Sequence, residues 1–287
     1  MAHIKFSTDS AADIPAALRE ELGIQVLPFP IALGDREYLD SVDFSPEEFY
    51  PMLLAASQIP THAQLTPFQF QQCFEEVWKE GYTDLIHTSI NAKASATYQN
   101  AIRAREEFYE EHPEAGDHFQ IHIIDAGNYT MSYGWAVMEG ARMAAAGAEA
   151  QEIVDYIRDW MAHVRVVFAP LDLTFAKKSG RVSAAAAFVG EALGLKPIMT
   201  FTEGESRIIS KVRGEKNVIS TLVDLCKAER ESGTPYLLIR ANNPDQADKL
   251  LEACCRELGE EPAQQFYIGG VIAINAGPNL VGLIYRA

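Results

Sequence analysis

The stretch that decides the fold is residues 84–108, which read DLIHTSINAKASATYQNAIRAREEF. Its first part, residues 85–90, is a short apolar run and predicts a buried strand. Its last part has apolar side chains at helical spacing and predicts a helix. The turn between them is small and rich in hydroxyl groups. This arrangement places Ser95 and Thr97 beside the unpaired N–H groups at the start of the helix.

Two interpretations of this turn remain open at the level of sequence. Ser95 can act simply as the N-cap of the helix, and spacing alone favours this interpretation. Alternatively, the N–H groups, the helix dipole and the hydroxyls of Ser95 and Thr97 can together hold a negatively charged headgroup. A ligand site therefore needs support from other parts of the chain.

Strand and helix patterns alternate along the first 163 residues. Strands are expected at 4–7, 24–27, 85–90 and 121–124, a turn at 34–35, a loop at 60–64, and helices at 13–23, 45–55, 66–81, 98–108, 131–146 and 151–163. Capping boxes that begin at Ser45 and Thr66 mark the starts of two of these helices. Such alternation predicts an α/β fold with a mainly parallel sheet covered by helices on both faces. Ligands in these sheets gather at the carboxyl ends of strands, where Asp9, the 91–97 turn and Asp125 would meet.

The pattern changes after residue 163. Strands are expected at 164–169, 196–201, 207–209, 236–240, 266–274 and 280–286, and helices at 171–180, 215–231 and 245–258. We therefore expect an N-terminal α/β domain at 1–162 and a smaller C-terminal α+β two-layer domain at 163–287, with a ligand between them.

Composition restricts the function classes. Hydrophobic residues make up 48% of the 287 residues and charged residues 22%, as in a soluble globular protein with an ample core. The net charge of −16 argues against a nucleic-acid partner, since phosphate binding needs a basic face. The four cysteines show no C-x-x-C spacing, no leader peptide is visible and no apolar run could span a bilayer. We expect a cytoplasmic protein with free thiols.

Common catalytic motifs are missing from the sequence. It contains no G-x-S-x-G, P-loop, H-E-x-x-H or G-x-G-x-x-G after a strand, and its seven histidines are scattered, so we expect no metal site and no catalytic residue. Asp9 and Asp13 could form a carboxylate pair for phosphoryl chemistry. The favoured interpretation is that Asp13 caps a helix and Asp9 is a turn residue.

Several short stretches, each weak alone, occur in order along the whole chain. They are STDSAADIP at 7–15, DFSPEEFY at 43–50, SATYQ at 95–99, KKSGRVS at 177–183, LKPI at 195–198, KVRG at 211–214 and GP at 277–278. Together they resemble the DegV family of lipid-binding proteins. The resemblance implies one long-chain fatty acid, with its carboxylate between two domains and its tail in an apolar tunnel. It implies no cofactor, no catalysis by this chain, a monomer and at most transient membrane contact.

In some members of that family the protein is the acyl-carrying subunit of a fatty acid kinase, and a separate kinase subunit phosphorylates the bound carboxylate. By the resemblance, Ser95 stands where the family's carboxylate-contacting serine stands. Arg181 and Arg213 match arginines of family motifs, and Arg213 falls where members are thought to meet the kinase subunit. These two arginines are the expected partner surface.

This chain also departs from the family pattern. His62-Ala63-Gln64 replaces a common Thr-Ser-Gln, Asn91-Ala92 replaces Ser-Ser, and Asn275 replaces a histidine near the C-terminus. We hypothesise that His62 and Asn275 jointly replace the usual threonine and histidine as donors to the headgroup, beside Ser95 and Thr97. An imidazolium would hold a carboxylate by a charge-assisted bond.

The wall of the tunnel has candidates in an apolar cluster after the domain boundary. These are Phe175, Phe188, Val189 and Leu193, although such a cluster is more often plain core. Two alternatives to the carrier interpretation stay open. One is a hydrolase or phosphotransferase that uses Asp9 or His62 on a small metabolite, and the other is a lipid sensor without a kinase partner. The sequence does not give the chain length or the unsaturation of the fatty acid.

Overall fold

The computed structural model describes residues 3–189 and 194–287. The chain divides into two compact units. The first comprises Met1–Ile31, Glu37–Asp43 and His62–Ala162, and the second comprises Ala32–Arg36, Phe44–Thr61 and His163–Ala287. Within the described ranges, no helix has the length and apolarity needed to cross a membrane.

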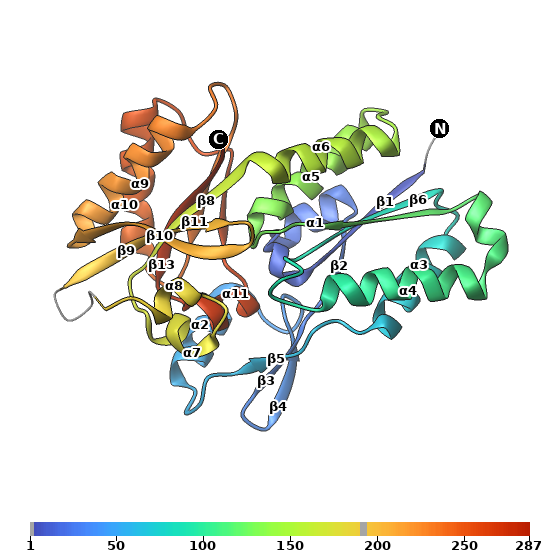
Figure 1. The fold of residues 1–287 in the computed structure, drawn as a ribbon, viewed down its shortest axis with the longest axis horizontal. Coiled ribbons are helices and arrows are strands. Elements are labelled where there is room, and N and C mark those ends of the chain that lie inside the picture. Colours follow the sequence, from blue (N-terminus) through green and yellow to red (C-terminus); the bar gives the residue numbers. More distant parts are fainter. Residues whose placement is uncertain (1–2, 190–193) are drawn as a thin grey trace. The chain divides into compact units, whose positions relative to one another are not determined.

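The first unit is built on a parallel sheet of four strands in the order β2-β1-β6-β7 (Figure 1). The strands are β1 (Ile4–Asp9), β2 (Gln25–Leu27), β6 (Asp84–Ser89) and β7 (Gln120–Asp125). All four run the same way, so their carboxyl ends meet at one edge of the sheet. The predicted parallel α/β architecture is confirmed.

Helices cover both faces of this sheet, as adjacent residues of β1 show. Phe6 faces α5 (Met131–Ala145), where it lies close to Gly140. Ser7 points to the other face and contacts His87, whose ring packs edge-to-face against Phe70 of α3 (Pro67–Lys79). This alternation is the two-residue period of a strand. The remaining helices of the unit are α1 (Ala16–Leu22), α4 (Thr97–Glu111), α6 (Ala150–His163) and the 3₁₀ helices η1 (Ser10–Ala12) and η2 (Pro113–Asp117).

The second unit contains a mixed sheet of six strands in the order β10-β9-β8-β13-β11-β12. Neighbours are antiparallel except β11 and β12, which are parallel. The strands are β8 (Val164–Pro170), β9 (Leu195–Thr202), β10 (Glu205–Arg213), β11 (Tyr236–Arg240), β12 (Gln264–Tyr267) and β13 (Leu280–Arg286). Two long helices, α9 (Glu215–Glu229) and α10 (Pro244–Leu258), pack side by side on it over an apolar core (Figure 1).

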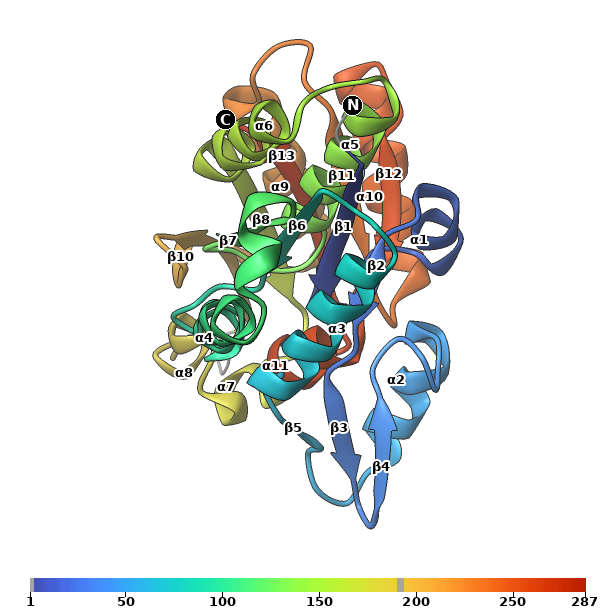
Figure 2. The ribbon, with the colours of Figure 1, turned by 90° about the vertical axis from the view of Figure 1, so that its right-hand side faces the viewer.

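Shorter elements complete the chain. They are α2 (Pro46–Ala55), α7 (Thr174–Ser179), α8 (Ser183–Ala186), α11 (Gly270–Ala276) and a small three-stranded sheet in the order β4-β3-β5 from β4 (Arg36–Leu39), β3 (Pro30–Leu33) and β5 (Thr61–His62). Figure 2 shows the two longer strands of this sheet as a hairpin. The capping boxes expected at Ser45 and Thr66 are both present, because each side chain accepts from the third helical N–H and the side chain there bonds back.

Three expectations from the sequence were wrong. The strand expected at 266–274 ends at Tyr267, and α11 follows; its residues are mostly buried, and periodicity does not separate a short buried helix from a strand. The loop expected at 60–64 contains the short strand β5. Asp13 does not cap the following helix: it ends η1 with φ of 54°, and α1 begins at Ala16 after Pro15.

Candidate functional site

The carboxyl ends of three neighbouring strands fix the turn that follows β6. Asp9, the last residue of β1, accepts a hydrogen bond from the N–H of Ile90 at 2.7 Å. Asp125, the last residue of β7, accepts one from the N–H of Ala92 at 3.0 Å and one from Gly127 at 2.8 Å. The turn is therefore held from both sides by carboxylates that the sequence had placed at this edge.

Asp9 is fully buried and its two oxygens are both engaged. Besides the bond from Ile90, it accepts a 2.6 Å bond from the hydroxyl of Tyr133. Burial raises the pKa of the Asp9 carboxyl to about 6, although these hydrogen bonds act in the opposite direction. Asp13, the other acid considered for chemistry, accepts a 2.5 Å bond from the hydroxyl of Thr130. Both acids thus hold parts of the protein together.

Asn91 shapes the turn itself. Its Oδ1 accepts from the N–H of Lys93 at 3.0 Å, and its Nδ2 donates to the hydroxyl of Tyr129 at 2.7 Å. Its carbonyl oxygen accepts from the N–H groups of Ala94 and Ser95. The bond from the N–H of Lys93 to Asn91 Oδ1 makes an Asx turn. Asparagine favours such turns because its side-chain oxygen can accept from the backbone N–H two residues further on. Asn91 therefore determines where Ser95 lies relative to the start of α4.

Ser95 and Thr97 form a short chain of hydroxyl groups at the start of α4. The N–H of Leu65 donates to Thr97 Oγ1 at 3.3 Å, and Thr97 Oγ1 lies 2.8 Å from Ser95 Oγ. Ser95 Oγ also accepts from the N–H of Thr97 at 3.2 Å. Thr97 is fully buried and Ser95 is half-buried. The helix begins at Thr97 with Ala96 at the N-cap, so Ser95 bonds the first helical N–H from one position further back than expected.

Either hydroxyl of the Ser95–Thr97 pair can be the donor, and one of the two arrangements leaves a proton for a ligand. Because Leu65 donates to the Thr97 hydroxyl, the Thr97 proton can be given to Ser95 Oγ. Ser95 Oγ then accepts two bonds, and its own proton is left to donate outward, beside the N–H groups of a helix of 15 residues. Such an arrangement suits an anionic oxygen. The contact of Ser95 and Thr97 with a ligand stays a prediction.

The two residues proposed to replace family donors have different surroundings. His62 is half-buried in β5, and its ring packs edge-to-face against buried Phe29 with ring centroids 6.2 Å apart. Asn275 lies in α11, where its Nδ2 donates to the carbonyl oxygen of Val271 at 2.7 Å. The carbonyl oxygen of Asn275 also accepts from Ser179 Oγ at 2.9 Å, which ties α7 to α11. Their role toward a ligand stays a prediction.

The candidates for a tunnel wall are separated by the structure. Phe175 and Phe188 are buried, and Phe175 lies against the backbone of Gly277. Val189 is 86% exposed, so it does not line an interior channel here. The short helix α8 ends at Ala186, and the side chain of Val189 beyond it is exposed to solvent. Leu193 lies outside the described residues.

Both arginines expected to contact a partner are exposed. Arg181 follows α7, and its Nη1 donates to the carbonyl oxygen of Ser179 at 2.9 Å. Arg213 ends β10 and is exposed as well. Exposure makes both available for contact with another protein, and that role stays a prediction.

Several residues that build the site carry no mark in the local sequence. Tyr133 comes from α5, Leu65 from the segment before α3 and Tyr129 from the loop after β7, far from the turn they hold. The position of Asp9 and Asp125 at strand ends was the one signal available. Nothing in local spacing marks a tyrosine that donates to an aspartate more than a hundred residues away.

Comparisons with known proteins cover the whole chain. A model of the DegV family, described as an uncharacterised protein family, matches residues 3–287. A DegV domain-containing protein of Caldanaerobacter subterraneus subsp. tengcongensis is 33% identical over 100% of this chain and 99% of its own length.

Two solved structures share the fold. One, described as fatty acid binding of a DegV family protein from Thermus thermophilus, is 26% identical, has a TM-score of 0.86 and is matched over 99% of this chain and 100% of its own. The other, a stearic acid-binding protein from Eubacterium ventriosum, is 20% identical with a TM-score of 0.87, over 100% of this chain and 98% of its own. These matches run from end to end, and we conclude that the chain belongs to the DegV family.

Proposed function

We propose that this protein binds one long-chain fatty acid and holds its carboxylate at the turn before α4. The observation that supports the proposal is the set of hydrogen bonds from Leu65 through Thr97 to Ser95 at a helix start, in which Thr97 can donate to Ser95 and Ser95 can then donate to a ligand. The fatty acid binding described for the Thermus relative, at 26% identity over nearly the whole chain, supports the choice of anion.

The two ends of a fatty acid contribute unequally to binding. A carboxylate at a helix N-terminus gains about 0.3–1 kcal/mol from the dipole and about 1.5–3 kcal/mol from a hydrogen bond to the charged group. Each buried methylene contributes about 0.8 kcal/mol, so a long tail dominates the affinity. The turn therefore sets orientation and selects an acid over a neutral lipid. Buried Phe175 and Phe188 are proposed wall residues for the tail.

We further propose that the chain acts as a carrier that presents the carboxylate to a kinase subunit, with Arg181 and Arg213 in the contact. Both arginines are exposed cations that can pair with carboxylates of a partner surface. The hydrolase or phosphotransferase alternative receives no support at Asp9, because both of its oxygens are already bonded and the side chain is fully buried. A lipid sensor without a kinase would use the same site.

Mass spectrometry of an organic extract from natively purified protein tests the ligand. We expect one fatty acid per chain, and about tenfold weaker fatty acid binding in Ser95→Ala because one hydrogen bond to a charged group is lost. The matched control is Ser45→Ala, which removes a serine from the start of α2 and should leave binding unchanged. His62→Ala should also weaken binding if His62 donates to the headgroup.

Two outcomes would contradict the proposed ligand site. The first is protein that is empty after native purification and does not bind added fatty acid. The second is binding that Ser95→Ala and Ser45→Ala reduce equally, which would show that Ser95 acts only through helix stability. A kinase partner is tested separately with Arg213→Glu. We expect this variant to retain the bound lipid but to lose phosphorylation of the bound acid.

A further inference from the structure

Three side chains with metal-binding atoms come together at the C-terminal ends of α3 and α4. Glu75 lies in the last part of α3, Glu111 is the last residue of α4, and His112 follows it. One ligand atom from each lies within 4.8 Å of the other two. The two helices pack side by side in the first unit (Figures 1 and 2), so the cluster bridges them. It is at the opposite end of α4 from Ser95, about 22 Å along the helix axis.

The imidazole of this cluster is held in place by aromatic neighbours. Its ring centroid lies 4.7 Å from that of Trp78 and 5.0 Å from that of Phe108. The N–H of His112 donates to the carbonyl oxygen of Phe108 at 2.9 Å. A ring fixed in this way loses little conformational entropy when it binds an ion.

The electrostatics at this end of α4 favour a cation. The last turn contains Glu111 and no basic residue, and the helix dipole adds negative charge there. Glu114 brings a further carboxylate, whose Oε1 lies 3.8 Å from His112 Nδ1. Lys79 pairs with Glu75, but both side chains are substantially exposed, and such surface pairs are weak enough for a divalent ion to displace.

We propose that Glu75, Glu111 and His112 form a site for a divalent transition-metal ion of the zinc class. One imidazole with two carboxylates is a ligand set that Zn²⁺ accepts, whereas Mg²⁺ and Ca²⁺ prefer oxygen ligands alone. Metal–ligand distances of about 2 Å require the three groups to move closer together. Side-chain rotation of exposed Glu111 and half-buried Glu75 supplies that movement. Glu114 or water completes the coordination.

Such an ion would be structural. It would cross-link the ends of two helices that are far apart in the sequence and neutralise carboxylates that repel one another. Because the turn before α4 lies at the other end of the helix, fatty acid binding should not depend on the ion. The inference is therefore independent of the proposed function.

Isothermal titration of metal-free, full-length protein with ZnCl₂ tests the site. We expect one saturable site, with binding at least about tenfold weaker in Glu111→Gln and in His112→Ala. The matched controls are Glu110→Gln and His118→Ala, which change exposed neighbours outside the cluster and should bind Zn²⁺ as the parent does. Zn²⁺ should raise the Tm of the parent and of Glu110→Gln but not of Glu111→Gln.

Three results would overturn the proposal. They are the lack of a saturable site, equal affinity in Glu111→Gln and Glu110→Gln, and Mg²⁺ binding as tight as Zn²⁺. Glu111→Gln is the decisive variant because its side chain is exposed, whereas His112→Ala also removes ring contacts with Trp78 and Phe108. Circular dichroism of the same samples distinguishes loss of the ion from loss of the fold.

Discussion

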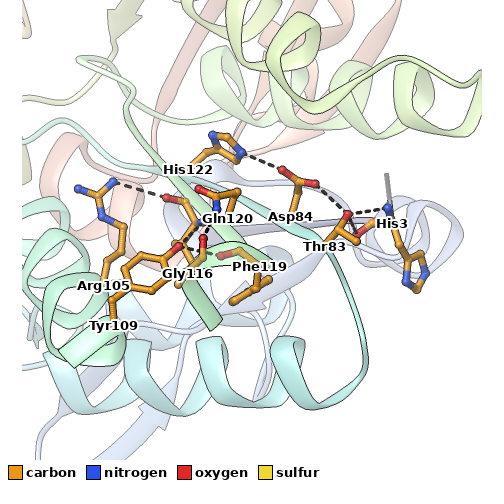
Figure 3. A network of polar contacts seen from close by, with 10 residues as sticks. His3, Thr83, Asp84, Arg105, Tyr109, Gly116, Phe119, Gln120 and His122 are labelled. Atoms are coloured by element: carbon orange, nitrogen blue, oxygen red, sulfur yellow. Dashed lines mark hydrogen bonds and ion pairs between the residues drawn. The ribbon is translucent and has the colours of Figure 1, made fainter. Parts of the chain in front are cut away.

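The two ends of the parallel sheet in the first unit both gather polar side chains, and the proposed ligand donor, Ser95, lies at the carboxyl end. At the amino end, His122 Nε2 lies 3.0 Å from Asp84 Oδ1, and the hydroxyl of Thr83 donates to Asp84 Oδ2 at 2.8 Å (Figure 3). The Tyr109 hydroxyl accepts from the N–H of Ile121 and donates to the carbonyl oxygen of Phe119. Each of these groups pairs with a neighbour, and Tyr109 ties the start of β7 to α4.

The carboxyl end is built differently. Asp9 and Tyr133 are fully buried, the N–H of Leu65 donates to the Thr97 hydroxyl, and Thr97 Oγ1 lies 2.8 Å from Ser95 Oγ. The number of polar residues therefore does not by itself distinguish the two ends. We propose that the difference is a donor held by its protein partners at a helix start, where an anion is favoured.

The largest expected effect is the loss of stability at low pH, because β6 buries a neutral histidine between the two ends of the sheet. His87 is fully buried, and its Nδ1 lies 2.8 Å from Ser7 Oγ. Burial lowers the pKa of His87 from 6.5 to about 3. The unfolded chain therefore takes up a proton below pH 6.5 that the native protein does not, and stability falls as the pH falls from 6.5 toward 3.

Asp9 responds in the opposite sense. Its native pKa of about 6 lies above the ordinary value of 3.8, so the native state gains a proton first and gains stability as the pH falls from 6 toward 4.

Replacing His87 with Gln should remove the stability that His87 costs at low pH. The free energy of unfolding should then fall less between pH 7 and pH 4 than it does in the parent, by about 3 kcal/mol. Chemical denaturation at both pH values measures this. An equal fall in the free energy of unfolding in the parent and in His87→Gln would disprove that His87 is neutral in the folded protein.

A matched pair of Tyr→Phe substitutions compares the two ends directly. Tyr133→Phe removes a charge-assisted bond to buried Asp9 and should lower the free energy of unfolding by about 2 kcal/mol at pH 7. Tyr109→Phe removes bonds at the partly exposed amino end and should lower it by about 1 kcal/mol. Urea denaturation gives both values. If Tyr109→Phe lowers the free energy of unfolding more than Tyr133→Phe does, the hydrogen bonds at the carboxyl end do not contribute more to stability than those at the amino end.

The smallest effect is expected for Thr97→Val, which keeps the shape of the side chain but removes the hydroxyl that directs Ser95. Fatty acid binding should weaken by about threefold, less than in Ser95→Ala, because Ser95 remains but is no longer oriented. Titration with a fluorescent fatty acid measures the ratio. A loss in Thr97→Val as large as in Ser95→Ala would mean that Thr97 itself contacts the ligand.

Much of this organisation could be predicted from local patterns. The alternation of strands and helices gave the parallel sheet, and the boxes at Ser45 and Thr66 located two helix starts. Local signals failed where a short segment is buried on every side, as in α11, and where backbone conformation depends on neighbours, as at Asp13. In both places tertiary contacts override intrinsic preference.

The sequence by itself determined the strand–turn–helix around Ser95 and the approach of Asp9 and Asp125 to it, because the carboxyl ends of parallel strands share one edge. Only the tertiary structure decided that Leu65 donates to Thr97, that Tyr133 completes Asp9, and that Glu75 lies near His112. The physical reason is that these contacts join residues remote in the chain. Their directions depend on which donors surround each oxygen after packing, and no periodicity in the sequence encodes that.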